Sequence, residues 1–135
     1  MDVIAADGVP VAFFDEGHGP AILILPPGLD DGGHYAPVAR RLARRFRVIR
    51  LRRRSYRDDL PPGHQVTVAG ELEDVKALAG AVEGPIVLVG HSSGGNLALQ
   101  ALAALPGRFA GAVLYEPVFV TDRPVLNPES YRAQC

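Results

Sequence analysis

The chain has 135 residues, of which 47% are hydrophobic and 21% are charged, and its formal net charge is −1. These values are typical of a single globular domain with a buried core, and the near-neutral charge gives no reason to expect a nucleic-acid or membrane partner. The only cysteine is Cys135, which excludes an internal disulfide, and residues 1–7 do not have the features of a signal peptide. No apolar run approaches the roughly 18 residues of a membrane-spanning helix, and we expect a cytoplasmic location.

The N-terminal half of the chain predicts a hairpin, a strand, a helix and another strand. Residues 3–14 contain two apolar runs separated by the turn signal Asp7-Gly8, which is typical of an antiparallel hairpin. Residues 21–25 are continuously apolar, as in a strand buried on both faces. A helix is expected over 34–45 and a strand over 47–51. The helix assignment depends on apolar residues at helical spacing: Val38, Leu42 and Phe46.

The C-terminal half continues the alternation. A polar loop over residues 52–64 leads to a helix over 67–82 and a strand over 85–90. The next helix, over 93–105, is apolar nearly all round, which predicts that it is buried. A last strand spans 109–115. This order predicts an α/β fold: a mainly parallel, twisted sheet with helices on both faces and an antiparallel first hairpin.

Residues Gly90-His91-Ser92-Ser93-Gly94 form the pattern G-x-S-x-G between a predicted strand and a predicted helix. This context is typical of a nucleophile elbow. Ser92 is then the candidate nucleophile, and Gly90 and Gly94 allow strand and helix to approach closely around a sharp turn. The N–H of Ser93, at the start of the helix, suits a developing oxyanion. The alternative is a glycine-rich turn without chemistry.

The segment Pro26-Pro27-Gly28-Leu29 ends the strand over 21–25. The C-terminal ends of parallel strands lie on one rim of a sheet, so this loop and the elbow are expected to be neighbours. The backbone N–H of Leu29 is the candidate for a second oxyanion donor. The alternative is a turn that only ends the strand.

With these motifs, residues 3–120 resemble the N-terminal half of an alpha/beta-hydrolase-fold enzyme, similar to small bacterial esterases, lipases and haloperoxidase-like hydrolases. The resemblance implies hydrolysis of an ester or related acyl bond of a small molecule through an acyl-enzyme on Ser92, with no cofactor and no metal. It also implies one partial domain over residues 1–135, in which 121–135 begin a cap or form an irregular tail. Relatives that act on epoxides or haloalkanes use Asp at the elbow, and Ser92 argues against those activities.

The sequence departs from the family pattern in three places. The oxyanion strand ends in Pro27-Gly28, where relatives usually have His-Gly. The loop Leu51–Tyr56 lacks the glycines of the common pattern D-x-R-G-x-G-x-S. The third departure is that no histidine follows Ser92, although the triad order in this fold is serine, acid, histidine.

The catalytic base and acid are therefore expected in a missing C-terminal part, and the chain is interpreted as a truncated hydrolase. His91 is expected to pack beneath the elbow, and His34 is a minor candidate at the site rim. Glu116, at the end of the last strand, is the candidate acid; the favoured alternative is a rim residue that bonds neighbouring backbone. The uncovered edge of the last strand predicts self-association.

Ten arginines lie between Arg40 and Arg57. One interpretation is a patch for nucleic acid or phosphate. The favoured interpretation is the solvated face of a helix and a loop, because no interleaved aromatic residues suggest base stacking. We expect no nucleic-acid partner.

Two functions remain open from the sequence. The first is a serine hydrolase in which Ser92 attacks and the N–H groups of Leu29 and Ser93 stabilise the oxyanion. The second is a non-catalytic fragment or binding module that retains half of the fold without turnover. A reading frame that continues with an Asp and a later His would favour the enzyme.

Overall fold

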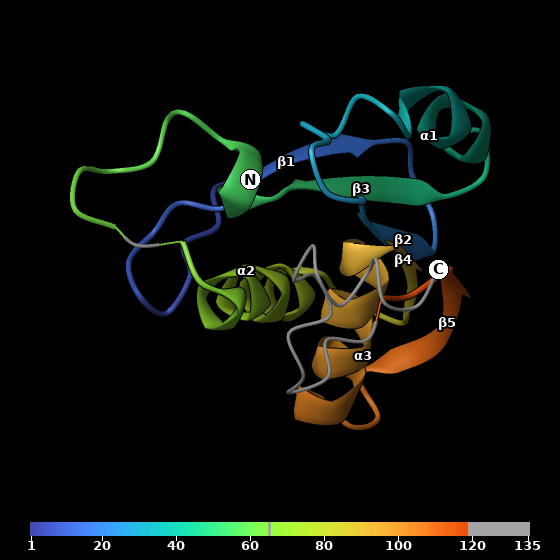
Figure 1. The fold of residues 1–135 in the computed structure, drawn as a ribbon. Helices are drawn as coiled ribbons and strands as arrows, with labels where there is room; N and C mark the ends of the chain where they lie inside the picture. The colour runs from blue at the N-terminus through green and yellow to red at the C-terminus, as the bar shows by residue number, and fades with distance from the viewer. Residues whose placement is uncertain (65, 119–135) are drawn as a thin grey trace, which may run out of the picture.

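The computed structural model describes residues 1–64 and 66–118, and its centre is a five-stranded sheet with the strand order β1-β3-β2-β4-β5 (Figure 1). The strands are β1 (Ala12–Glu16), β2 (Ala21–Leu25), β3 (Arg47–Arg52), β4 (Ile86–His91) and β5 (Phe109–Tyr115). The helices are α1 (Ala36–Leu42), α2 (Val68–Ala81) and α3 (Ser93–Ala104), with a short 3-10 turn, η1 (Arg54–Tyr56).

The sheet is parallel except at one edge. β2 pairs in parallel with both β3 and β4, and β4 pairs in parallel with β5. β1 runs antiparallel to β3, with Phe14 opposite Arg50. The predicted α/β class with an antiparallel leading edge is therefore confirmed.

The predicted hairpin over residues 3–14 forms around the Asp7-Gly8 turn, but it is shorter than expected. Residues 3–11 pair antiparallel through the Ile4–Pro10 bridge and through N–H bonds from Ala5 to the Val9 carbonyl and from Val11 to the Val3 carbonyl, both at 2.9 Å. From Ala12 onward the chain leaves this hairpin and forms β1, which pairs with β3. The apolar pattern is satisfied all the same, because Val3, Ala5, Val9 and Val11 are all buried. Periodicity identifies a buried extended segment, but it does not identify the strand that will pair with it.

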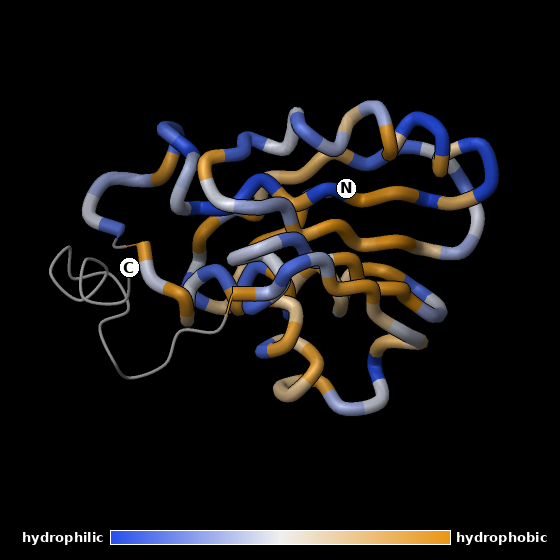
Figure 2. Tube along the Cα trace, turned by 45° about the vertical axis from the view of Figure 1, so that its right-hand side comes forward, coloured by the Kyte–Doolittle hydropathy of each residue, from blue (hydrophilic) through white to orange (hydrophobic). Residues whose placement is uncertain are grey.

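The apolar strand β2 lies at the centre of the hydrophobic interior. All five β2 residues are buried, as the continuous apolar run predicts, because this strand lies at the centre of the sheet with helices on both sides. Figure 2 shows the hydrophobic segments along the strands in the middle of the molecule and the hydrophilic ones mainly around them. β5 differs from β2: it lies at the end of the strand order, and Val113 and Tyr115 are 59% and 58% exposed.

One face of the sheet is covered by α1. Ala39 of this helix is fully buried against Ile22, Ile24 and Val48 of the sheet. The predicted apolar face is partly wrong, because Val38 is exposed and Ala39 takes the inward position. The helix is also shorter than the predicted 34–45, and its last turn tightens through a bond from the Arg45 N–H to the Leu42 carbonyl.

The opposite face is covered by α2 and α3 (Figure 1). Thr67 caps α2 by accepting a hydrogen bond from the N–H of Gly70 at 3.0 Å, which fixes the start of the helix. Val75 and Leu78 of α2 are fully buried in the same cluster as Leu97 of α3. α3 is buried on one face only, with Ala103 and Ala104 exposed, so the prediction that it is buried all round is wrong for the described residues.

The C-terminal end of α2 is held by an arginine from the loop before β5. Arg108 donates hydrogen bonds to the carbonyls of Ala79 at 2.7 Å, Val82 at 2.5 Å and Gly84 at 2.8 Å. The last carbonyls of a helix have no partners within the helix, and a cation is favoured at this end by the helix dipole. A single side chain therefore ends α2 and ties it to the start of β5.

We predict that Arg108→Met lowers the free energy of unfolding by about 1–3 kcal/mol, because part-buried carbonyls lose a charged donor. Urea unfolding of the purified chain measures this change. Arg45→Met is the matched control, since Arg45 is exposed and its side chain has no hydrogen-bond partner among the described residues, and it should shift stability by less than about 0.5 kcal/mol. Equal effects of the two substitutions would contradict the capping role.

The arginine cluster is not a uniformly solvated face, which corrects the interpretation from sequence. Arg50, Arg53 and Arg54 are 8%, 6% and 2% exposed. Arg54 pairs with Asp74 of α2 at 2.7 Å and with Asp7 at 2.5 Å. Arg53 pairs with Glu71 of α2 at 2.9 Å, so Arg53 and Arg54 join η1 and its flank to α2, and Arg54 also joins η1 to the N-terminal turn. Arg50 instead pairs with Glu16 of β1.

The two carboxylates on Arg54 respond differently to their surroundings. The hydrogen bond from Arg54 lowers the pKa of Asp7 from 3.8 to about 2, because this bond outweighs the opposing effect of burial on the carboxylate. The pKa of Asp74 is raised, because burial of this carboxylate outweighs the same guanidinium. A lowered pKa in the folded state favours folding above pH 4, and this contribution is lost as the pH falls toward 2.

Asp7→Asn should therefore destabilise the protein most above pH 4, with the difference from wild type shrinking as the pH falls from about 4 to about 2. Because Asp74 is retained in both proteins, its opposite contribution largely cancels in the comparison. Urea unfolding of both proteins between pH 6 and pH 2.5 measures the difference. A difference that stays constant over this range would refute the assignment.

Candidate active site

Three residues with strained backbones lie at the C-terminal ends of three parallel strands. Leu29, Ser92 and Glu116 have φ angles of 62°, 54° and 46°, and no other non-glycine residue among those described has a positive φ. Leu29 follows β2, Ser92 follows β4 and Glu116 follows β5, so all three lie on one rim of the sheet. Such conformations are costly and gather at functional sites.

The turn at Ser92 is held by backbone hydrogen bonds from both sides. The Ser92 N–H donates to the carbonyl of Tyr115 at 2.9 Å, and the Ser92 carbonyl accepts from the N–H groups of Gly95 at 2.9 Å and Val118 at 3.2 Å. β4 thus passes into α3 through one residue with φ 54° and ψ −119°. This geometry fixes Ser92 between the end of β5 and the first turn of α3.

The glycines around Ser92 lie where no side chain fits. A Cβ on Gly94 would overlap the backbone carbonyl oxygens of Leu25 and Pro26 at the end of β2. A Cβ on Gly90 would lie 2.7 Å from the Gly94 carbonyl oxygen and 2.9 Å from the Cβ of Ala98. The absence of side chains therefore allows α3 to start directly against β4 and against the loop that leaves β2.

The backbone N–H groups of Leu29 and Ser93 have no hydrogen-bond partner among the described residues. Ser93 is the first residue of α3, where N–H groups lack partners within the helix. The loop that carries Leu29 contacts the same helix start, because a Cβ on Gly28 would lie 3.5 Å from the Ser93 Oγ. The side chain of Leu29 is 93% exposed, so its strained backbone is not explained by packing.

Asp30 shapes the loop that follows Leu29. Its carboxylate accepts hydrogen bonds from the N–H groups of Gly32 at 2.9 Å and His34 at 3.2 Å, and the residue is only 8% exposed. Arg50 of β3 donates to the Gly32 carbonyl, which joins this loop to the sheet. The loop from β2 to α1 is thus fixed by polar contacts as well as by the chain on either side.

His91 contacts aromatic residues on the α1 face of the sheet. Its ring centroid lies 4.9 Å from that of Tyr115 and 5.9 Å from that of Tyr35, both in edge-on geometry. His34 lies 6.2 Å away on the same side. Burial, followed by the neighbouring Tyr115 and Asp30, raises the pKa of Tyr35. These contacts agree with the expectation that His91 packs beneath the elbow, and they bring His34 close to it.

Glu116 lies beside the elbow through its backbone. The bonds of Tyr115 and Val118 to Ser92 bracket it, and its side chain is exposed with no hydrogen-bond partner among the described residues. Its place on the rim agrees with the sequence, but neither of the two roles considered for its carboxylate follows from these contacts.

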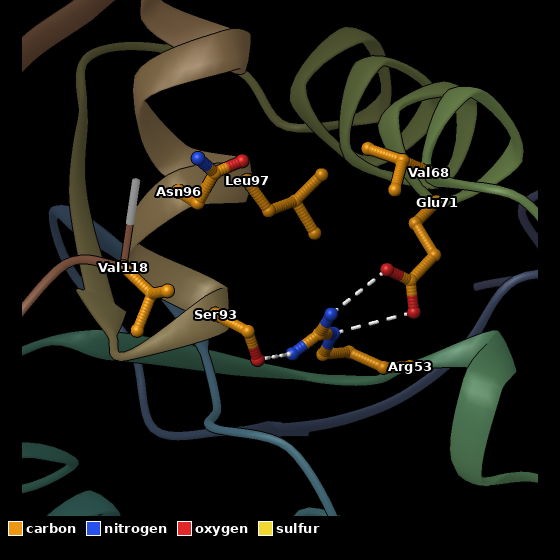
Figure 3. A pocket seen from close by; sticks show the side chains of 7 residues that line it. All are labelled: Arg53, Val68, Glu71, Ser93, Asn96, Leu97 and Val118. Carbon is orange, nitrogen blue, oxygen red and sulfur yellow. Dashed lines mark hydrogen bonds and ion pairs between the residues drawn. The ribbon is translucent and has the colours of Figure 1, made fainter. Parts of the chain in front are cut away.

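A small cavity of about 90 Å³ lies beside Ser93, between α2, α3 and the segment after β3 (Figure 3). Its polar wall is a chain of contacts in which Arg53 donates to the Ser93 Oγ at 2.6 Å and pairs with Glu71 at 2.9 Å. Its apolar wall consists of Val68, Leu97 and Val118.

Arg53 and Glu71 were not expected at this site from the sequence. The sequence of α2 did contain one indication that these residues are buried and paired. Glu71 and Asp74 fall on the same helical face as the apolar residues Val75 and Leu78, where a solvated carboxylate would not be expected. Carboxylates on a buried face require buried cations, and the arginines of the 50–54 segment supply them.

Among residues 1–64 and 66–118, no group of three His, Cys, Asp or Glu side chains is arranged to hold a metal ion. The helices of this part of the chain are also too short or too polar to cross a membrane.

The sequence and the fold were compared with those of known proteins. The Alpha/beta hydrolase family pattern matches residues 6–134. The solved structure of an alpha/beta hydrolase from Sphaerobacter thermophilus DSM 20745 superposes with a TM-score of 0.79 at 34% identity, covering 99% of this chain and 52% of that one. A thermophilic esterase from Thermogutta terrifontis gives a TM-score of 0.79 at 26% identity, covering 92% of this chain and 47% of the esterase.

The monoglyceride lipase of Homo sapiens is 46% identical over 46 residues, which are 34% of this chain and 14% of the lipase. The chain spans about half the length of the two solved structures. The family pattern covers nearly the whole sequence, and the fold also superposes on the solved structure of an alpha/beta hydrolase. This chain therefore belongs to the alpha/beta hydrolase family.

Proposed function

We propose that the protein is a serine hydrolase that cleaves an ester or related acyl bond of a small molecule, with Ser92 as the nucleophile. The observation that carries this proposal is that the strained residues lie together on one rim of the sheet. Among the described non-glycine residues, positive φ angles occur only at Leu29, Ser92 and Glu116. Relatives described as esterases and as a lipase support the reaction class.

In this proposal, the Ser92 Oγ attacks the carbonyl carbon of the substrate while a general base takes its proton. The negative charge that develops on the carbonyl oxygen is stabilised by the N–H groups of Leu29 and Ser93, which have no other partner among the described residues. Loss of the alcohol leaves an acyl-enzyme on Ser92, and water then releases the acid. Neither a metal nor a cofactor takes part.

The base of this reaction is assigned to a part of the whole protein outside these 135 residues. All four histidines of the chain lie at or before His91, whereas the order in this fold places the base after the nucleophile. Glu116 is the candidate acid within the chain. The chain spans about half of the solved family members, which leaves room for such a segment.

The second candidate function is a binding module that retains the fold and performs no turnover. The observation that favours it is the environment of the nearest imidazole, because His91 contacts Tyr35 and Tyr115 and is not bonded to Ser92. Such a module would keep the strained rim without reacting with acyl groups.

Hydrolysis of p-nitrophenyl acetate by the protein at the length made in its source tests the proposal. We expect Ser92→Ala to lower kcat by about 10³-fold or more, because the nucleophile is lost while the fold is kept. Turnover that is the same in wild type and variant would contradict the proposal, and absence of turnover in the wild type would favour the binding module.

A further inference from the structure

Arg53 connects three segments that meet at the elbow. Its Nη1 donates to the Pro26 carbonyl at 3.2 Å and to the Ser93 Oγ at 2.6 Å. Its Nε and Nη2 donate to the two carboxylate oxygens of Glu71 at 3.3 Å and 2.9 Å (Figure 3). One planar guanidinium thus reaches the loop after β2, the first residue of α3 and the first turn of α2.

The arrangement is rigid because every partner is buried or held elsewhere. The side chains of Arg53 and Glu71 are 6% and 3% exposed. One Glu71 oxygen also accepts from the Ser55 Oγ at 2.8 Å. A forked guanidinium–carboxylate pair has a fixed plane, so the direction in which Nη1 points is set by Glu71.

Tyr56 supports the same loop from a second direction. The Arg53 guanidinium lies over the Tyr56 ring, 5.4 Å from its centroid. The Tyr56 hydroxyl lies against Gly28, where a Cβ would approach it to 2.8 Å. Tyr56 therefore connects the Arg53 guanidinium to Gly28, the residue before Leu29.

We propose that Arg53 is a positioning residue that fixes the separation and direction of the two oxyanion donors, the N–H groups of Leu29 and Ser93. This inference rests on the proposed function and deepens it. Arg53 does not touch the reacting atoms. It acts through the Pro26 carbonyl, three residues before one donor, and through the side chain of Ser93, the residue that carries the other donor.

The physical reason is that oxyanion stabilisation depends on preorganised geometry. A donor displaced by about 1 Å loses much of its effect on the transition state, on the order of 100-fold in rate. Because the oxyanion exists only after attack, loosening these donors lowers the rate of the chemical step and leaves ground-state binding nearly unchanged.

The test uses the double variant Arg53→Met/Glu71→Leu. Replacing both members of a buried ion pair by apolar side chains is often neutral or stabilising, whereas removing one member leaves an unpaired charge. The double variant therefore removes the contacts to Pro26 and Ser93 and is expected to keep the fold. Ser93→Ala is the second variant, because it removes only the Oγ acceptor and keeps the backbone N–H.

Arg57→Met is the control, because Arg57 pairs with the exposed Asp59 and donates to the Pro10 carbonyl.

The readout is the reaction of Ser92 with a fluorophosphonate in the protein at the length made in its source, resolved into the inactivation rate and the reversible binding constant. We expect the double variant to lower the inactivation rate by about 10- to 100-fold and Ser93→Ala by about tenfold. The binding constant should change by less than about twofold, and the thermal midpoint should stay near that of wild type. Arg57→Met should react like wild type.

The outcomes separate this inference from the proposed function. If wild type reacts and the folded double variant reacts equally fast, the positioning role is overturned and the serine hydrolase stands. If wild type does not react, the proposed function fails. The positioning role is then tested separately by the amide resonances of Gly28, Leu29 and Ser93. Shifts of these resonances in the double variant support the positioning of the donors by Arg53; unchanged resonances refute it.

Discussion

Gly94→Ala is expected to destabilise the protein by at least about 3 kcal/mol and to abolish reaction at Ser92. The added methyl group would overlap two backbone carbonyls, those of Leu25 and Pro26, and neither belongs to a flexible side chain. α3 would have to move away from β2, which costs packing and displaces the elbow. Urea unfolding and fluorophosphonate labelling of the same preparation measure both effects.

The control for this substitution lies in α2. Gly80 is exposed and helical, and a methyl group added there would meet no atom within 4 Å, so Gly80→Ala should stabilise by up to about 1 kcal/mol. The same chemical change is thus predicted to have opposite signs at two helical glycines. Similar effects at both positions would show that the contact between Gly94 and the end of β2 is not tight.

Arg54→Met is expected to lower the free energy of unfolding by about 3–5 kcal/mol. The substitution removes the guanidinium from between Asp7 and Asp74 and leaves Asp74, which is 1% exposed, as a buried carboxylate without a cation. The pKa of Asp74, already raised by burial, should rise further, so the loss should be larger at pH 7 than at pH 4.

Arg44→Met is the comparison for this prediction, because Arg44 is exposed and its side chain forms no hydrogen bond or ion pair among the described residues. It should change stability by less than about 0.5 kcal/mol at either pH. If Arg54→Met were equally mild, the three-residue cluster of Asp7, Arg54 and Asp74 would be a surface feature, and its burial in the structure would be contradicted.

The elements with strong local signals could be predicted from the sequence. β2 and β5 match their apolar runs, and α2 (Val68–Ala81) lies within one residue of the predicted range 67–82 at each end. Their ends are set by Gly, Pro or a capping side chain, which act over a few residues. The rule that parallel strands end on one rim then placed Leu29, Ser92 and Glu116 on the same edge, while their chemical roles remain predictions.

The contacts that could not be predicted join residues far apart in the chain. Arg53 pairs with Glu71 across 18 positions, and Arg54 pairs with Asp7 across 47 positions. An arginine-rich segment has the same composition whether it is solvated or paired, so composition alone favours the solvated interpretation. The pairing of β1 with β3 was missed for the same reason, since alternation within a strand does not identify its neighbour.

Labelling of the protein in a lysate of its source with a fluorophosphonate probe, followed by intact mass and peptide mapping, tests whether Ser92 is a nucleophile. We expect one label per polypeptide, located on the peptide that contains Ser92 and absent from Ser92→Ala. The intact mass would also give the length of the polypeptide that reacts. A folded protein that stays unlabelled, or a label that persists in Ser92→Ala, would contradict the claim and leave the strained rim as part of a binding module.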